Sequence, residues 1–167
     1  MADEPQSSPD GASGGANGAE GQSQFQIIAQ YVKDLSFENP GAPGTISGGR
    51  PQVGLKVDIQ ARRAADEQYE VTLKLRVEAT QEDRTAFLLE LVYGGLFLLR
   101  NIPEESLQPA LLIECPRMIF PFARRIVADA IRDGGMPPLM IEPIDFVALY
   151  RARIAEQQAG AQAPARQ

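Results

Sequence analysis

The sequence contains no histidine and only one cysteine among its 167 residues. Histidine is the usual general base at neutral pH and a common zinc ligand. Its absence therefore excludes Ser-His and Cys-His nucleophile pairs and most zinc sites. A lone cysteine cannot form an internal disulfide, and Cys115 has no partner base, so we expect a small semi-buried residue near a helix start. We expect no enzyme, no cofactor and no metal site.

Long apolar runs are also missing. The stretches 87–99 and 107–113 are too short, or too interrupted by Glu90 and the pair Gly94-Gly95, to cross a bilayer. The first residues contain no apolar segment of the kind found in secretory signals. These features predict a cytoplasmic protein with no direct membrane insertion.

Phosphate-binding motifs are lacking too. Residues 44–51 (GTISGGRP) have the glycine spacing of a phosphate loop, but Arg50 replaces the lysine and Pro51 replaces the hydroxyl residue, so a flexible loop is the better interpretation. Sixteen Lys and Arg residues against 22 Asp and Glu residues give a net charge of −6, which repels nucleic acid and anionic lipid. A basic partner is favoured, although an acidic balance also serves solubility.

Composition divides the chain into three zones. Residues 1–24 are acidic and rich in glycine, and they carry too little apolar surface to offset the entropy of ordering, so we predict a disordered tail. Residues 25–158 have clear apolar periodicity and form the predicted folded domain. Residues 159–167 (AGAQAPARQ) return to low complexity, which predicts a flexible C-terminal tail.

Alternating apolar and polar residues predict strands. The pattern is clearest in 69–81 (YEVTLKLRVEATQ) and in 53–61 (VGLKVDIQA), which the polar segment 62–68 joins as a hairpin. Residues 25–38 and 85–99 are longer strands with large apolar side chains on both faces. A sheet with two apolar faces must bury both of them, each against another layer of structure or another subunit.

Helical spacing appears after the strands, in residues 119–135 and 144–158. Strands followed by helices predict an α+β fold, in which two helices pack on one side of a four-stranded antiparallel meander. The remaining apolar face of the first and fourth strands is not covered by these helices, which predicts an oligomer.

Three segments, in this order, carry a resemblance to a known family: 25–43 (FQIIAQYVKDLSFENPGAP), 85–97 (TAFLLELVYGGLF) and 115–124 (CPRMIFPFAR). They resemble SecB, the bacterial protein-export chaperone, and the likeness covers about residues 25–158. The resemblance implies a homotetramer built as a dimer of dimers. It also implies an ATP-independent holdase that binds unfolded secretory precursor proteins and delivers them to the SecA motor ATPase for Sec-dependent export.

Strand geometry places Asp34, Ser36 and Glu38 on one face of the first strand, and Leu88 and Glu90 on one face of the fourth. The resemblance implies that Asp34, Glu38, Leu88 and Glu90 form the docking surface for SecA, whose zinc-bearing C-terminal segment is basic. Without the resemblance, four solvated edge residues would be the simpler interpretation.

The alternate residues of the fourth strand point the other way, and the resemblance implies tetramer contacts there, at Leu89, Leu91 and Tyr93. Tyr93 departs from the family pattern, since some members have a polar residue at this position. In the family, client chains bind in grooves beside the second helix and the loop after the first strand. From their positions we expect the groove to be lined by Phe37, Ile46, Met136, Phe146 and Tyr150. Core packing is the alternative for Phe146 and Tyr150.

Two other functions stay open. One is an enzyme on an α+β scaffold, which the missing histidine disfavours. The other is a SecB-like chaperone or adaptor that serves a different partner, for example in a toxin–antitoxin system. Binding to the C-terminal segment of SecA separates the second alternative from an export chaperone.

Overall fold

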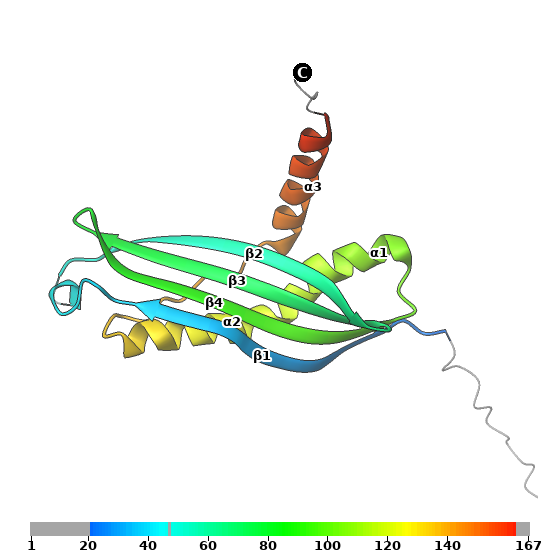
Figure 1. The fold of residues 1–167 in the computed structure, drawn as a ribbon, viewed down its shortest axis with the longest axis horizontal. Helices are drawn as coiled ribbons and strands as arrows, with labels where there is room; N and C mark the ends of the chain where they lie inside the picture. The colour runs from blue at the N-terminus through cyan, green and yellow to red at the C-terminus, as the bar shows by residue number, and fades with distance from the viewer. Residues whose placement is uncertain (1–20, 47, 163–167) are drawn as a thin grey trace, which may run out of the picture.

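Four long antiparallel strands form the framework of the fold in a computed structural model, which describes residues 21–46 and 48–162 (Figure 1). They are β1 (Gln24–Glu38), β2 (Gln52–Ala65), β3 (Gln68–Gln81) and β4 (Arg84–Arg100). All four were predicted, and the α+β class is confirmed. The predicted N-terminal tail lies outside the described residues up to residue 20, and residues 163–167 of the predicted C-terminal tail also lie outside them.

The strand order is β1-β4-β3-β2, so the sheet departs from a simple meander. Tight turns join β2 to β3 and β3 to β4, whereas residues 39–51 separate β1 from β2 and include the 3₁₀ turn η1 (Gly44–Ile46). A connection of this length does not force its two strands to pair, because only a short hairpin loop fixes neighbouring strands. Strand β1 therefore returns to pair with β4, and β1 and β2 form the two edges of the sheet.

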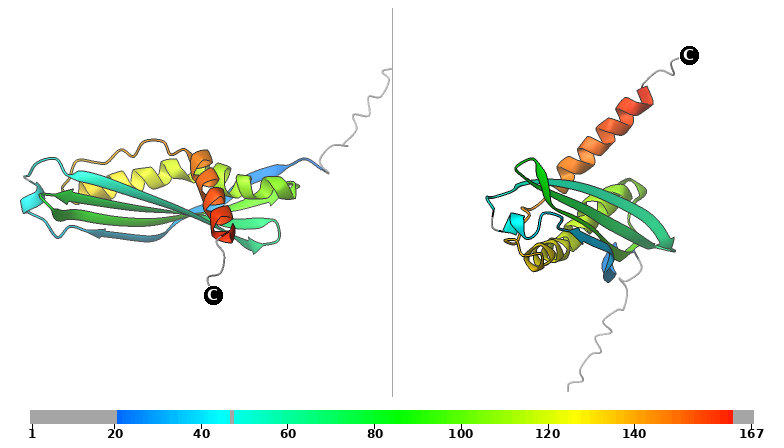
Figure 2. Two further views of the ribbon diagram at one scale, coloured as in Figure 1. Left: turned by 90° about the horizontal axis from the view of Figure 1, so that it is seen from above. Right: turned by 60° about the vertical axis from the view of Figure 1, so that its left-hand side comes forward.

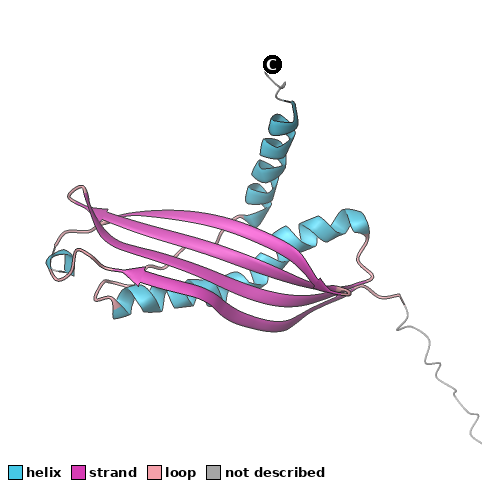
Figure 3. Ribbon diagram, viewed as in Figure 1, coloured by secondary structure: helices cyan, strands magenta, loops and turns pink. Residues whose placement is uncertain are grey.

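A broken helical segment packs on one face of this sheet (Figure 3). It consists of α1 (Glu104–Pro109), the π-helical turn η2 (Ala110–Glu114) and α2 (Cys115–Asp133). Pro116 has no N–H to donate to the carbonyl of Leu112, and the wider π turn lies at this break in the hydrogen-bond ladder. Helix α2 packs against β4, β3 and β1.

Helix α3 (Phe146–Gln162) covers little of the sheet. Its first residue, Phe146, is buried against Phe120 of α2, with ring centroids 5.9 Å apart. The C-terminal part of the helix projects away from the body of the protein (Figure 2). The predicted second covering helix is therefore present, but only its first turns pack against the domain. None of the helices that the structure describes is long and apolar enough to cross a membrane.

The two faces of the sheet differ in cover, and we call them the inner and the outer face. The inner face lies under α2 and carries the core, in which the largest contributions from the sheet come from Val71, Leu73, Leu75, Val77, Leu89, Leu91 and Phe97. The two consecutive glycines of β4 mark the two faces. A Cβ on Gly95 would lie 3.1 Å from Ile119 of α2, whereas a Cβ on Gly94 would meet the ring of Tyr31 on the opposite side.

Candidate functional site

The residues predicted to dock a basic partner lie together on the outer face. Glu38 is the register partner of Leu88, and Ser36 is the register partner of Glu90, so the four predicted residues occupy adjacent strands β1 and β4. Asp34 and Glu38 are exposed, whereas Leu88 and Glu90 are half-buried. Within the described residues, neither Asp34 nor Glu38 has an ion-pair partner. This group of residues forms an acidic half of the outer face.

The other half of the outer face carries several basic side chains, interspersed with the carboxylates of Asp58 and Glu78. Lys56 on β2 and Lys74 and Arg76 on β3 point to the same side as Glu90, because Arg76 is the register partner of both Lys56 and Glu90. Arg76 donates from Nη1 to Oε1 of Glu90 at 2.6 Å. Alternation in 69–81 identifies Lys74 and Arg76 as outward residues, but it gives no register with β4. The ion pair could therefore not be found from the sequence.

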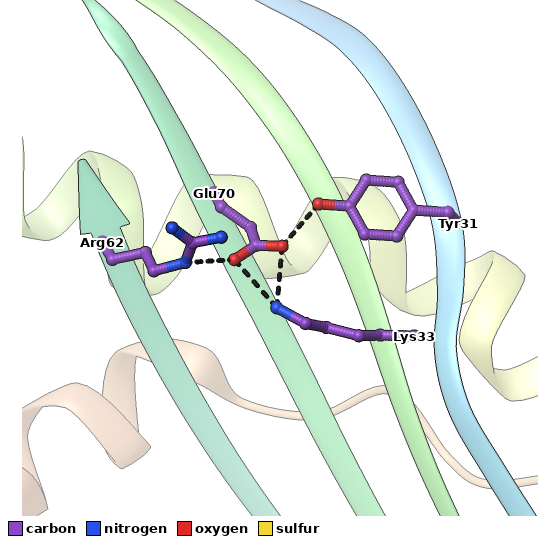
Figure 4. Close-up of polar contacts among 4 residues, drawn as sticks. All are labelled: Tyr31, Lys33, Arg62 and Glu70. Atoms are coloured by element: carbon purple, nitrogen blue, oxygen red, sulfur yellow. Dashed lines mark hydrogen bonds and ion pairs between the residues drawn. The ribbon is translucent and has the colours of Figure 1, made fainter. Parts of the chain in front are cut away.

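A buried carboxylate on the outer face joins side chains of three strands, β1, β2 and β3 (Figure 4). Glu70 on β3 has only 5% of its surface exposed. It accepts hydrogen bonds from Tyr31 Oη at 2.6 Å, from Lys33 Nζ at 2.9 Å and from Arg62 Nε at 2.5 Å. Tyr31 and Lys33 belong to β1 and reach across β4, and the missing side chain of Gly94 leaves the space for the tyrosine ring.

These contacts change two pKa values in opposite directions. The hydrogen bond from Tyr31 and those from Lys33 and Arg62 lower the pKa of Glu70 to about 2, against the opposing effect of burial. Burial, followed by the hydrogen bond to Glu70, raises the pKa of Tyr31 to about 12. At neutral pH the pair is therefore a carboxylate and a neutral phenol, which suits a fixed structural contact across the sheet better than proton transfer.

The Glu70 cluster predicts an acid-dependent stability. Because folding lowers the pKa of this carboxyl from 4.5 to about 2, its contribution is complete above pH 4.5 and is lost as the pH falls toward 2. We expect about 2–3 kcal/mol of unfolding free energy to disappear in this window. Urea unfolding at a series of pH values measures this change. Glu70→Gln should flatten the dependence, and Glu78→Gln, which removes an exposed carboxylate from the same strand, should preserve it.

The residues predicted to make tetramer contacts are covered within the single chain. Leu89 and Leu91 have no exposed surface and Tyr93 has 7%, because all three belong to the inner face beneath α2. Large apolar residues occupy both faces of β4. Alternation therefore assigns each residue to one of two faces, but it does not show which face the helix covers. The chain's own helix α2 packs over these three residues, and their part in subunit contacts stays a prediction.

The predicted groove residues divide into two groups. Met136 and Phe146 are buried in the core, with 6% and 2% of their surface exposed, so the expectation that they line an open groove is wrong. Met136 follows the C-terminal end of α2, and Phe146 begins α3. In this region the chain packs over the core. Phe37 is half-buried against Phe87, with ring centroids 5.8 Å apart. Ile46 is 48% exposed.

Tyr150 is half-buried and lines a hollow of about 390 Å³ between α3 and the edge strand β2. Arg153 closes one side of this hollow by donating a hydrogen bond of 2.7 Å to the carbonyl oxygen of Ile59 on β2. A second hollow, of about 570 Å³, lies between the loop after β1 and the turn after β3, and its lining includes Pro40, Thr45, Gln81 and Arg84. The two hollows share no lining residue, and a continuous client groove stays a prediction.

Exposed apolar side chains on β2 were missed by the sequence prediction. Val53 and Leu55 lie on the inner face but remain 43% and 37% exposed, because α2 packs on the other three strands. Met140, in the connection to α3, is 63% exposed. Alternation had marked Val53 and Leu55 as core residues of a half-buried strand. Only the position of α2 shows that this end of β2 is uncovered.

Cys115 lies at the start of α2 with no exposed surface. Burial, and secondarily the nearby carboxylate of Glu114, raises its pKa to about 12. The thiol is therefore protonated and inaccessible at neutral pH, which suits a packing residue.

Comparisons with known proteins agree on one family. The family model described as "Preprotein translocase subunit SecB" matches residues 18–157. A protein-export protein SecB from Maricaulis maris is 52% identical over 147 residues, covering 87% of this chain and 86% of its own length. The protein of the same name from Rhizorhabdus wittichii is 55% identical over 143 residues, covering 85% and 86%.

One solved structure resembles the fold. It is a SecB-like chaperone of Mycobacterium tuberculosis in complex with a peptide from the HigA1 antitoxin, with a TM-score of 0.57 and 18% identity, covering 72% of this chain and 90% of that one. At this identity the likeness concerns the fold alone.

Proposed function

Because this chain belongs to the SecB family of protein-export chaperones, we propose that it binds unfolded secretory precursors and delivers them to SecA. Holding a chain unfolded requires surface burial and no catalytic step. The binding partners are then extended polypeptides in a cytoplasmic location, where precursors wait before export. ATP has no role in the holding step, because a protein that binds only the unfolded state withdraws it from folding by mass action.

The observation that carries this proposal is the uncovered apolar surface beside the edge strand β2. Val53 and Leu55 on β2, Ile46 in the loop after β1 and Met140 in the connection to α3 are four large apolar side chains, each more than a third exposed. Burying one such side chain contributes about 1.5–3 kcal/mol before ordering costs are subtracted. The unpaired edge of β2 also offers backbone groups for a client strand. An exposed apolar surface binds without requiring a particular sequence, which suits many different clients.

We propose that the chain assembles as a homotetramer, a dimer of dimers, through surfaces other than the one predicted from the sequence. Ile28, Val32 and Leu35 on the edge strand β1 are each about half exposed. Met118 and Phe122 on α2 are similarly exposed. Exposed apolar groups on an edge strand and on its covering helix support a contact with another copy. Four grooves in one assembly would strengthen client binding through effective concentration.

A refolding experiment tests the holdase. A slow-folding secretory precursor is diluted from denaturant with and without the chaperone, in the absence of nucleotide, and native structure is followed by fluorescence. We expect refolding to stop at a stoichiometric ratio and to resume when the chaperone is removed. Val53→Asp should weaken client binding by roughly tenfold, because a charge then occupies the apolar surface.

Gln52→Asp is the matched control, because the neighbouring position on β2 points to the outer face and receives the same charge. Equal loss of holding by both variants would show that net charge, and not the uncovered inner face, governs client binding. Normal refolding in the presence of the wild-type protein would remove the holdase function altogether.

A further inference from the structure

Arg76 lies between two carboxylates on the outer face. Its Nη1 donates to Glu90 on the neighbouring strand β4 at 2.6 Å, and its Nη2 is 4.0 Å from Oε2 of Glu78, two residues along β3. The three side chains are partly exposed, at 39% for Arg76, 27% for Glu90 and 47% for Glu78. The guanidinium is thus paired with Glu90 while a second, more exposed carboxylate stands within reach.

Beside Arg76, away from Glu90, the surface has a notch of about 120 Å³. It is lined by Gly54, Leu55, Lys56, Arg76 and Glu78. Gly54 is the register partner of Glu78, and its missing side chain leaves this space open, since a Cβ there would approach only the backbone oxygen of Glu78, at 3.8 Å. The notch is large enough to receive a displaced guanidinium next to Glu78.

We propose that Arg76 determines the specificity of the docking surface by acting as an internal cation on Glu90. A basic side chain of the partner must displace Arg76, which moves toward Glu78 and the notch beside Gly54. This inference rests on the proposed delivery to SecA, with the docking surface that the family resemblance implies on the acidic half of the outer face. Arg76 would then determine how many basic residues a partner needs in order to bind.

Because Arg76 must first be displaced from Glu90, a partner with a single positive charge binds this surface weakly. Exchanging Arg76 for one lysine of a partner replaces one ion pair with another and gains little. A cluster of basic residues also reaches Asp34 and Glu38, which lie on the same face without ion-pair partners in the described part of the chain. The surface therefore selects segments with several closely spaced cations over the isolated lysines found on most proteins.

The test measures binding of a fluorescent hexalysine peptide and of the C-terminal segment of SecA by anisotropy. Arg76→Gln should bind both about fivefold more tightly, because Glu90 no longer needs to be released. Gly54→Val fills the notch and should weaken binding by a similar factor. The double variant Arg76→Gln/Gly54→Val should match Arg76→Gln, because the notch matters only when Arg76 has to move.

Lys74→Gln is the matched control, since it removes the same charge from the same face but lies opposite Val92 instead of Glu90. Its effect should stay below twofold. Equal tightening by Lys74→Gln and Arg76→Gln would show that only the overall field matters and would overturn the inference. If the wild-type protein binds and Arg76→Gln binds with the same affinity, the role of Arg76 is contradicted but the docking proposal is not. If neither the wild-type protein nor any variant binds the peptides, both the role of Arg76 and the docking proposal are contradicted. Circular dichroism checks that each variant is folded.

Discussion

Replacing Leu91 with aspartate should leave no stably folded protein. Leu91 has no exposed surface and lies on the inner face beneath α2, so the substitution places a charge in a site without water or a partner. Burial of an unpaired carboxylate, added to the lost apolar contact, costs at least about 5 kcal/mol, which is comparable to the whole stability of a typical domain. Circular dichroism and thermal unfolding of the purified variant measure this loss.

Leu35→Asp provides a control at the neighbouring position. Leu35 is the register partner of Leu91, but it lies on the edge strand and is 44% exposed. This variant should fold, and light scattering should show a smaller assembly, because the new charge lies on the surface proposed for subunit contact. A folded Leu91→Asp variant that forms dimers would restore the interface predicted from the sequence and would contradict the core position of this residue.

Replacing Glu90 with lysine should reduce affinity for the C-terminal segment of SecA at least about thirtyfold. The wild-type residue contributes a carboxylate to the acidic half of the outer face. Lysine at this position would stand in one register row with Arg76 and Lys56, so three cations would face an incoming basic segment. Loss of attraction and gain of repulsion act together, and each close charge pair across an interface can contribute more than 1 kcal/mol. Calorimetric titration with the peptide measures the change.

The same substitution should leave the fold intact, because the side chain of Glu90 is 27% exposed and lies away from α2. Glu104→Lys, which makes the same charge change at an exposed position on α1, should bind SecA normally. Affinity that falls equally in both variants would indicate a general effect of net charge. If the wild-type protein fails to bind the peptide, delivery to SecA is excluded, and a SecB-like chaperone with a different partner becomes the better explanation.

Much of the fold follows from local patterns. Alternation in 69–81 and 53–61 predicted β3 and β2, and helical spacing predicted α2 and α3, because backbone geometry imposes these periods on any amphipathic element. The same rule placed Asp34, Glu38, Leu88 and Glu90 on shared faces of their strands. The family resemblance then gave these residues a role that alternation alone could not supply.

Other features required the pairing of distant segments. The cluster around Glu70 depends on Tyr31 and Lys33 crossing β4 at Gly94, and the sequence gives no register between β1 and β3. The ion pair between Arg76 and Glu90 depends on register in the same way. The predicted groove failed at Met136 and Phe146 for a related reason, because their burial depends on how the chain closes over the core after α2.

The sequence by itself determined the four strands, most of α2 and α3, and which side chains of a strand share a face, since these properties depend on neighbours one to four positions away. It did not predict α1 or η2. Only the tertiary structure decided that β1 pairs with β4, that α2 covers Leu89 and Leu91, and that Val53 and Leu55 stay exposed. Both faces of β4 are apolar enough to be buried. The choice between them is therefore made by the packing of α2, through contacts between residues far apart in the chain.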